Sequence, residues 1–133
     1  MKNFLLYLWQ LPQNLLGLLV IFFTRAKYND IDDNKKNNYW LSHKFGYFGV
    51  SLGKYIIFGN GTVSVTSVKH EQGHQKQSLY FGWLYLILVG LPSIARNIWD
   101  IIAHNNWQEE DRIKWYYNGY PEKQADKYGG VVR

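Results

Sequence analysis

The sequence predicts an α+β fold that is mainly helical, with a small β-hairpin or sheet preceding a metal-binding helix. Three observations lead to this prediction: an apolar run of helical length near the N-terminus, β-branched runs over residues 54–66, and two histidines four residues apart, His70 and His74. Alternation with a period of two suits a strand, whereas a spacing of four places residues on one face of a helix. A chain of 133 residues forms one domain, or one domain with a membrane-associated segment.

The N-terminal apolar run, Phe4–Phe23, is long enough to span a bilayer, which takes about 20 apolar residues. Its centre is interrupted by Gln10, Pro12, Gln13 and Asn14. Polar side chains are costly in lipid, and proline removes a helical hydrogen bond. We therefore expect residues 1–28 to form an apolar helical segment, either a kinked membrane helix or two short interfacial helices. A helix pair buried in a soluble core is the alternative.

A β-hairpin is expected directly before the metal-binding helix. Lys54–Phe58 and Thr62–Thr66 flank Gly59-Asn60-Gly61, and Asn-Gly is a strong turn signal between strands. The polar stretch Asn29–Asn38 has no apolar periodicity and is expected to be an exposed loop. The second strand of the hairpin would lead into a helix over Ser67–Tyr80.

The stretch from His70 to His74 reads His-Glu-Gln-Gly-His, which is an H-E-x-x-H motif. On a helix, both imidazoles lie on one face and can bind one metal ion. Two neutral nitrogen ligands suit tetrahedral zinc, and the carboxylate of Glu71 is positioned to take a proton from a water on the metal. The chain has no cysteine, so any further ligand must be His, Asp or Glu. The motif predicts a zinc site with Glu71 as catalytic base.

A second motif lies downstream, where Glu122 and Asp126 are again four residues apart with the small Ala125 between them. Glu122 would complete a set of two histidines and one glutamate, which leaves the fourth zinc position for water. Asp126 can accept the N–H of a ligand histidine and so orient its ring. Gln77 shares the face of the two histidines and could support them. A solvated terminal helix is the alternative for this segment.

The two motifs in this order resemble the gluzincin pattern of zinc metallopeptidases. Glu122-x-x-Ala125-Asp126 is similar to the form found in the membrane-bound group of CAAX prenyl proteases and bacterial heat-shock membrane proteases. The resemblance covers only the motifs and their order. It implies that residues 29–133 form a minimal zincin-like domain, that water attacks a peptide bond of a peptide or protein substrate, and that the protein associates with a membrane, the bacterial cell membrane. The H-E-x-G-H-x-x-Q-S core, which ends at Gln77 and Ser78, is also similar to a small uncharacterised bacterial family.

A zinc site restricts the path of the apolar segment that follows the first motif. Leu79–Leu91 is apolar up to Pro92-Ser93, and Ile94–Ala103 is partly apolar. A single crossing of a hydrocarbon core about 30 Å thick would separate the two histidines from the glutamate, although zinc ligands lie about 2 Å from the ion. The zinc site therefore requires residues 79–103 to form a helical hairpin, and we expect its turn at Pro92-Ser93.

Three tyrosines precede the helix of the third ligand: Tyr116, Tyr117 and Tyr120. One of their hydroxyls could stabilise an oxyanion during hydrolysis. Aromatic packing is the alternative for each of them.

The formal net charge is +5, but the basic residues are scattered among aromatic and acidic ones. We interpret this charge as solvated surface and expect no nucleic-acid partner. Two non-catalytic functions remain as alternatives. One is a small membrane-associated scaffold or interaction protein with a structural or degenerate metal site. The other is a membrane-active or immunity-type factor that acts through its apolar aromatic segments.

Overall fold

Four strands form one mixed sheet in a computed structural model that describes residues 1–29, 38–44, 46, 48–59 and 63–133. The order across the sheet is β1-β2-β4-β3. β2 and β4 are parallel, and the two outer pairs are antiparallel. The bounds are β1 (Lys27–Asn29), β2 (Asn38–Ser42), β3 (Gly49–Leu52) and β4 (Tyr55–Gly59).

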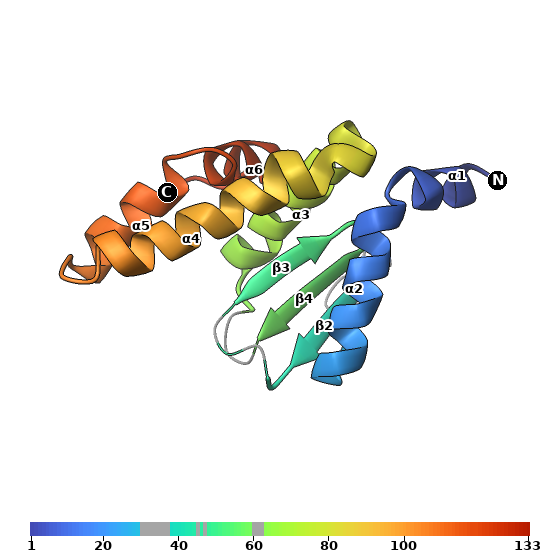
Figure 1. Cartoon of the computed structure of the whole chain (residues 1–133), viewed down its shortest axis with the longest axis horizontal. Coiled ribbons are helices and arrows are strands. Elements are labelled where there is room, and N and C mark those ends of the chain that lie inside the picture. The colour runs from blue at the N-terminus through green and yellow to red at the C-terminus, as the bar shows by residue number, and fades with distance from the viewer. Residues whose placement is uncertain (30–37, 45, 47, 60–62) are drawn as a thin grey trace.

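Helices make up most of the chain, which confirms the predicted α+β, mainly helical class. They are α1 (Lys2–Trp9), α2 (Leu11–Thr24), α3 (Val65–Phe81), α4 (Leu91–Ala103), α5 (Glu109–Tyr117) and α6 (Glu122–Gly129). A 3-10 turn, η1 (Gly82–Leu84), and a π-helical turn, η2 (Leu86–Gly90), connect α3 to α4. α2 crosses in front of the sheet, while α3 lies behind it with α6 beside it (Figure 1).

The central strand β4 is buried because the sheet is covered by helices on both faces. Its apolar run is therefore continuous rather than alternating, as expected for a strand with no solvated face. Ile56 and Phe58 pack with Tyr39 of β2 into a small core, and Val68 of α3 packs against it. This core fixes the start of α3 against the sheet.

The predicted hairpin with a second strand at Thr62–Thr66 is wrong. Val63 and Ser64 are irregular, and α3 begins at Val65. Ser64 caps this helix, since its Oγ accepts the N–H of Ser67 at 3.1 Å while its own N–H donates to the Ser67 hydroxyl at 2.7 Å. The hairpin is instead formed by β3 and β4, around Gly53 at φ 63°. Residues 60–62 and most of the predicted loop, 30–37, lie outside the described residues.

The N-terminal apolar run is broken as expected, and α1 meets α2 at an angle of 82°. The polar residues responsible for the break point into the protein. Gln13 donates to the Ser78 hydroxyl and to the Gly82 carbonyl, both at 2.9 Å. Asn14 accepts the N–H of Lys54 at 2.8 Å. The interrupting residues therefore attach α2 to α3 and to the β3–β4 hairpin.

The chain does reverse direction after α3, but at Gly82 rather than at Pro92-Ser93. Gly82 has φ 52°, a conformation that favours glycine. Pro92 stays within the helical segment. It has no N–H to donate to the carbonyl of Leu88, and the hydroxyl of Tyr120 donates to that carbonyl instead. The adjacent π-helical turn is a further accommodation of the proline.

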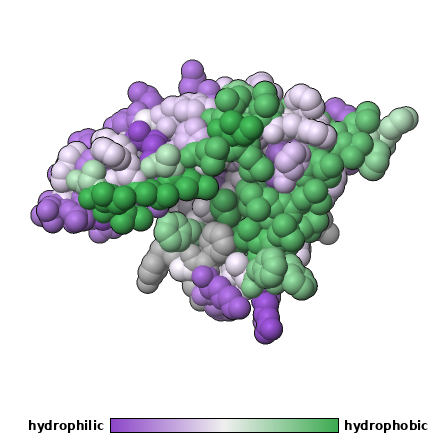
Figure 2. Space-filling view, viewed as in Figure 1, coloured by the Kyte–Doolittle hydropathy of each residue, from purple (hydrophilic) through white to green (hydrophobic). Residues whose placement is uncertain are grey.

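Polarity is distributed in an unusual way between the interior and the surface. Among the described residues, more polar and charged side chains than hydrophobic ones are buried, whereas most large apolar side chains of α1, α2 and α4 are exposed. Figure 2 shows hydrophobic residues gathered over α2 and along α4 on one face. The segment Leu86–Ala103 is long and apolar enough to cross a membrane. α1 and α2 together would also be long and apolar enough if they formed one bent span. By length and composition alone, these segments are compatible with a membrane.

Candidate metal centre

The two histidines lie on α3 where it packs against α6. Gly73, between them, makes this approach possible: a Cβ at this position would lie 1.9 Å from the carbonyl oxygen of Ala125. A second glycine, Gly129, has the same role at the other end of the contact, where a Cβ would lie 1.9 Å from the carbonyl oxygen of Lys69. Two glycines and one alanine therefore let the two backbones touch.

α6 begins at Glu122, directly after Pro121, and ends at Gly129, followed by the C-cap Gly130 in a left-handed conformation. This helix was predicted from the four-residue spacing of its acids. Glu122, Ala125 and Asp126 are its buried residues. They form the face that meets α3.

The donor atoms of His70, His74 and Glu122 converge, as the two motifs predicted. The Nε2 atoms of both histidines lie 3.0 Å from the same oxygen, Oε2 of Glu122. The three donor atoms lie within 4.8 Å of one another, and all three residues are buried. Tetrahedral ligands about 2.1 Å from an ion are about 3.4 Å apart, so slight outward movement of the side chains would admit a metal. This group can hold a metal ion.

Asp126 and Gln77 hold the other ring nitrogen of each histidine. Asp126 Oδ1 lies 2.7 Å from Nδ1 of His70, and Gln77 Oε1 lies 2.7 Å from Nδ1 of His74. With the proton on Nδ1, each Nε2 keeps its lone pair for a metal. Gln77 is in turn anchored by donating to the Gln124 side chain at 2.8 Å. The support that the spacing suggested for these two residues is therefore present.

Ser93 belongs to the candidate site, although the sequence did not reveal it. Its hydroxyl donates to Oε1 of Glu122, and the hydroxyl of Tyr116 donates to the same oxygen at 3.1 Å. One carboxylate oxygen thus faces the histidines while the other is held by hydroxyls from α4 and α5. No spacing in the sequence links Ser93 to Glu122, because the contact depends on the return of α4 across the site.

The three tyrosines have different positions. Tyr116 contacts the third ligand, and Tyr117 packs edge-on against the His70 ring, with centroids 5.1 Å apart. The guanidinium of Arg133 stacks on the Tyr117 ring, 3.5 Å from its centroid. Tyr120 donates to the Leu88 carbonyl and does not line the cavity at the ligands. Tyr116 and Tyr117 therefore lie near the candidate ligands, whereas Tyr120 does not.

A cavity of about 1000 Å³ opens onto the ligands. His70, His74, Glu71 and Glu122 line it together with the edge strand β3 and residues of α2, η2 and α4. Its size is that of a site for a small ligand or a short peptide segment.

Glu71 is buried beside the ligands, and its Oε2 is one of a few buried polar atoms without a hydrogen-bond partner among the described residues. Burial raises the pKa of this carboxyl, although the charges of His74 and His70 oppose the shift. Leaving a buried acceptor unsatisfied is costly, so such groups are kept mainly where they bind or react. A carboxylate with an open lone pair next to a candidate metal site fits the role of a base.

Without a metal, the two kinds of ligand stabilise each other's charge. Burial lowers the pKa of His70, but hydrogen bonds to Asp126 and Glu122 outweigh it and raise the pKa to about 9. Burial would raise the pKa of Glu122, but hydrogen bonds from both histidines bring it well below its usual range. The site is therefore a hydrogen-bonded network of imidazoles and carboxylates, in which a divalent cation would displace protons.

No protein-family model matches this chain. Neither the curated proteins nor the solved structures contain a match. The chemistry of the centre is therefore inferred from its own geometry.

Proposed function

We propose that the protein is a zinc-dependent metallopeptidase of gluzincin type that acts on peptide or protein substrates. The observation that carries the proposal is the convergence of three buried donor atoms beside an unpaired buried carboxylate, at the base of a cavity. A structural metal site needs no such carboxylate and is usually closed by four protein ligands.

Zinc is the metal that this donor set favours. Two imidazole nitrogens and one carboxylate oxygen form a typical catalytic zinc set, whereas magnesium and calcium prefer sites made of oxygen ligands. The hydrogen bonds from Asp126 and Gln77 to the two Nδ1 atoms would fix the ring orientations that such an ion requires.

The protein groups divide the work of hydrolysis. Bound zinc supplies a Lewis acid, which polarises a carbonyl and lowers the pKa of water. Glu71 accepts the proton of the attacking water on its open oxygen and passes it to the amine nitrogen that leaves. Its raised pKa suits it to both steps. Tyr117, on the cavity wall, is the tyrosine that we assign to the oxyanion.

We further propose a location at a membrane, the bacterial cell membrane. The exposed apolar side chains of α1, α2 and α4 support this location, and so does the membrane-compatible length of Leu86–Ala103. A soluble protein rarely exposes so large an apolar surface without a partner.

Replacing Glu71 by Gln tests the assignment directly. The Glu71→Gln variant should retain zinc, measured by elemental analysis of purified protein, and lose hydrolysis of a quenched fluorescent peptide library. Glu110→Gln, on the exposed side of α5, is the matched control and should change neither. Unchanged hydrolysis in Glu71→Gln refutes the role of the base. Absence of metal from the wild-type protein, with His70→Ala still folded, favours the non-catalytic scaffold instead.

A further inference from the structure

α2 has its polar and apolar sides reversed relative to a soluble surface helix. The side that contacts the sheet and α3 carries Gln13, Asn14 and Gly17, all buried. The outward side carries leucines and phenylalanines, which are exposed. A helix whose amides point inward and whose leucines point outward has a solvent-facing surface suited to lipid.

α4 is divided along its length into two stripes. Ser93, Asn97 and Asp100 line the cavity at intervals of three or four residues. An adjacent apolar stripe is exposed, composed of Ile87 of η2 and of Leu91, Ile94, Ile98, Ile101 and Ile102 of α4. A helix with a polar stripe and an apolar stripe lies in the plane of a membrane interface rather than across it.

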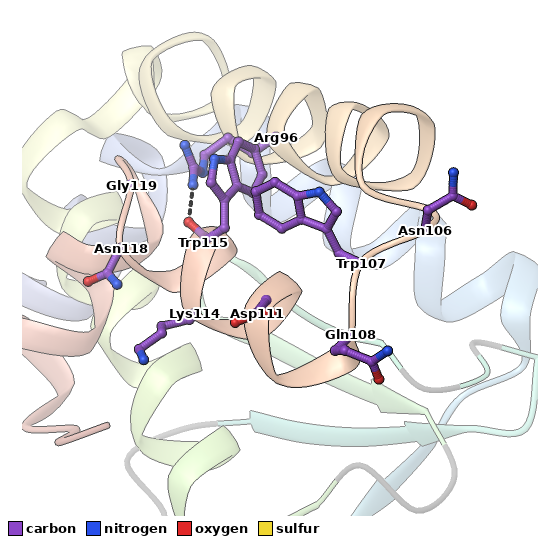
Figure 3. A pocket seen from close by; sticks show the side chains of 9 residues that line it. All are labelled: Arg96, Asn106, Trp107, Gln108, Asp111, Lys114, Trp115, Asn118 and Gly119. Carbon is purple, nitrogen blue, oxygen red and sulfur yellow. Dashed lines mark hydrogen bonds between the residues drawn. The ribbon is translucent and has the colours of Figure 1, made fainter.

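Contacts with α5 and α6 hold α4 against the rest of the domain, so that it does not leave the domain to cross a bilayer. Ser93 bonds to Glu122 near its start, and Asp100 pairs with Arg112 of α5 at 2.7 Å near its end. Between them, Arg96 stacks on the ring of Trp115, 4.0 Å from its centroid, and donates to the Trp115 carbonyl (Figure 3). Charged groups at the centre of a membrane span are also costly. α4 therefore stays beside the site along its whole length.

The cavity reaches the apolar surface between these two helices. Its lining extends from the metal ligands to Leu16 of α2, Ile87 of η2, and Leu91 and Ile94 of α4. All four side chains belong to the exposed apolar surface; Leu16 is 40% and Ile94 58% exposed. The cavity and the lipid-compatible surface therefore share a border, which we call the mouth.

We propose that α2 and α4 lie in one leaflet of a bilayer and that the mouth admits an apolar peptide segment from the lipid to the metal centre. The substrate class is a polypeptide whose apolar side chains partition into the membrane. As a statement about substrate, this rests on the proposed peptidase function. The occupant of the surface is lipid, because the side chains are aliphatic and aromatic over both helices and polar groups of these helices are turned inward.

Depth in the bilayer can be measured cleanly because the chain has no cysteine. Single nitroxide labels at Leu19→Cys and Ile98→Cys, with Lys123→Cys of α6 as control, are placed in phosphatidylglycerol–phosphatidylcholine vesicles. We expect oxygen to relax the labels at 19 and 98, and a water-soluble nickel complex to relax the label at 123. Relaxation by nickel at all three positions overturns immersion.

The mouth is tested with matched pairs on each helix. Leu16→Cys is compared with Leu19→Cys, and Ile94→Cys with Ile98→Cys; the second member of each pair is 53% and 52% exposed and does not line the cavity. Each variant carries Glu71→Gln, is alkylated with a bulky maleimide, and is exposed in vesicles to a leucine-rich peptide bearing a benzophenone. Photo-cross-linking should be lost at 16 and 94 and retained at 19 and 98.

Equal cross-linking in both members of each pair, or equal cross-linking of a serine-rich peptide of the same length, overturns the mouth. No bond is hydrolysed in this assay. Failure of the proposed peptidase activity would therefore appear only in the hydrolysis of peptides by the wild-type protein, and failure of the mouth only here.

Discussion

The hydroxyl of Ser93 and the carboxylate of Glu122 form a hydrogen bond that joins α4 to α6 at the centre of the site. Together with Tyr116, Ser93 occupies Oε1 of Glu122 and leaves Oε2 to the histidines. A ligand carboxylate held in this way offers one oxygen, so a metal would keep an open position for water.

Removing both hydroxyls should therefore weaken metal binding. We expect Ser93→Ala combined with Tyr116→Phe to lower zinc affinity about 10- to 100-fold, the usual effect of losing groups that orient a ligand. Competition with a chromophoric chelator measures it. Tyr120→Phe is the control, because its hydroxyl bonds to Leu88 and not to the site. Unaltered affinity in the double variant would show that Glu122 is oriented without these hydroxyls.

Asp126 should control the availability of His70. In Asp126→Asn the amide can donate to Nδ1, which would place the ring proton on Nε2 and block that nitrogen as a ligand. We expect the zinc affinity of this variant to be about 10- to 100-fold lower than that of the wild-type protein, with the fold unchanged. Lys123→Gln, an exposed change on the same helix, should have no effect. Nickel or cobalt titration monitored by absorption would reveal the loss of one nitrogen ligand.

Gly73 should tolerate no side chain. A Cβ at 1.9 Å from the Ala125 carbonyl must separate α3 from α6. Overpacking of this kind costs about 1–3 kcal/mol or more. We expect Gly73→Ala to lower the free energy of unfolding by at least this amount in denaturant titrations in mild detergent. Gly90→Ala is the matched control, since the nearest atom to its Cβ is 3.7 Å away; equal stability of both variants would contradict the packing of α3 on α6.

The metal-free protein should lose stability at alkaline pH. The pKa of His70 is about 9 in the folded protein, compared with 6.5 for an ordinary histidine. Stability from this group is full below pH 6.5 and is lost as the pH rises through about 9. On the acid side, hydrogen bonds from His70 and Arg133 outweigh burial and lower the pKa of Asp126, so its contribution is lost as the pH falls through the acid range.

Thermal unfolding of metal-free protein between pH 6 and 10 measures the alkaline limb. His70→Gln removes the titrating group and should flatten this limb. If the stability of His70→Gln fell equally steeply with rising pH, the loss of stability would be due to another group.

The ligand set was predictable because it depends on local spacing. Four residues separate His70 from His74 and Glu122 from Asp126, and helical periodicity alone places each pair on one face. The chemistry of two imidazoles then calls for a carboxylate, and Glu122 with Asp126 four residues later supplies one. Local helical spacing was therefore enough to predict the candidate ligands.

Contacts that depend on the chain path were not predictable in this way. Ser93 reaches Glu122 only because the chain turns at Gly82, whereas Pro92 was the stronger turn signal. The proline is accommodated because Tyr120, far along the chain, bonds to the carbonyl of Leu88. Likewise, Asn-Gly signalled a hairpin at Thr62–Thr66, but the Ser64 cap started the helix there instead. Ser64 was the available signal for the start of the helix. It was missed because the position three residues later holds Ser67, not the glutamate that usually completes a capping box.

The two stripes of α4 have a mechanical consequence. One stripe faces outward, and the other carries the serine that holds the third ligand. If this helix rotated, Ser93 would move with it, and the hydrogen bond that orients the Glu122 carboxylate would be lost. The affinity of the candidate centre for a metal would thereby depend on what covers the outer surface of α4. Protein from which that covering has been removed would bind metal more weakly.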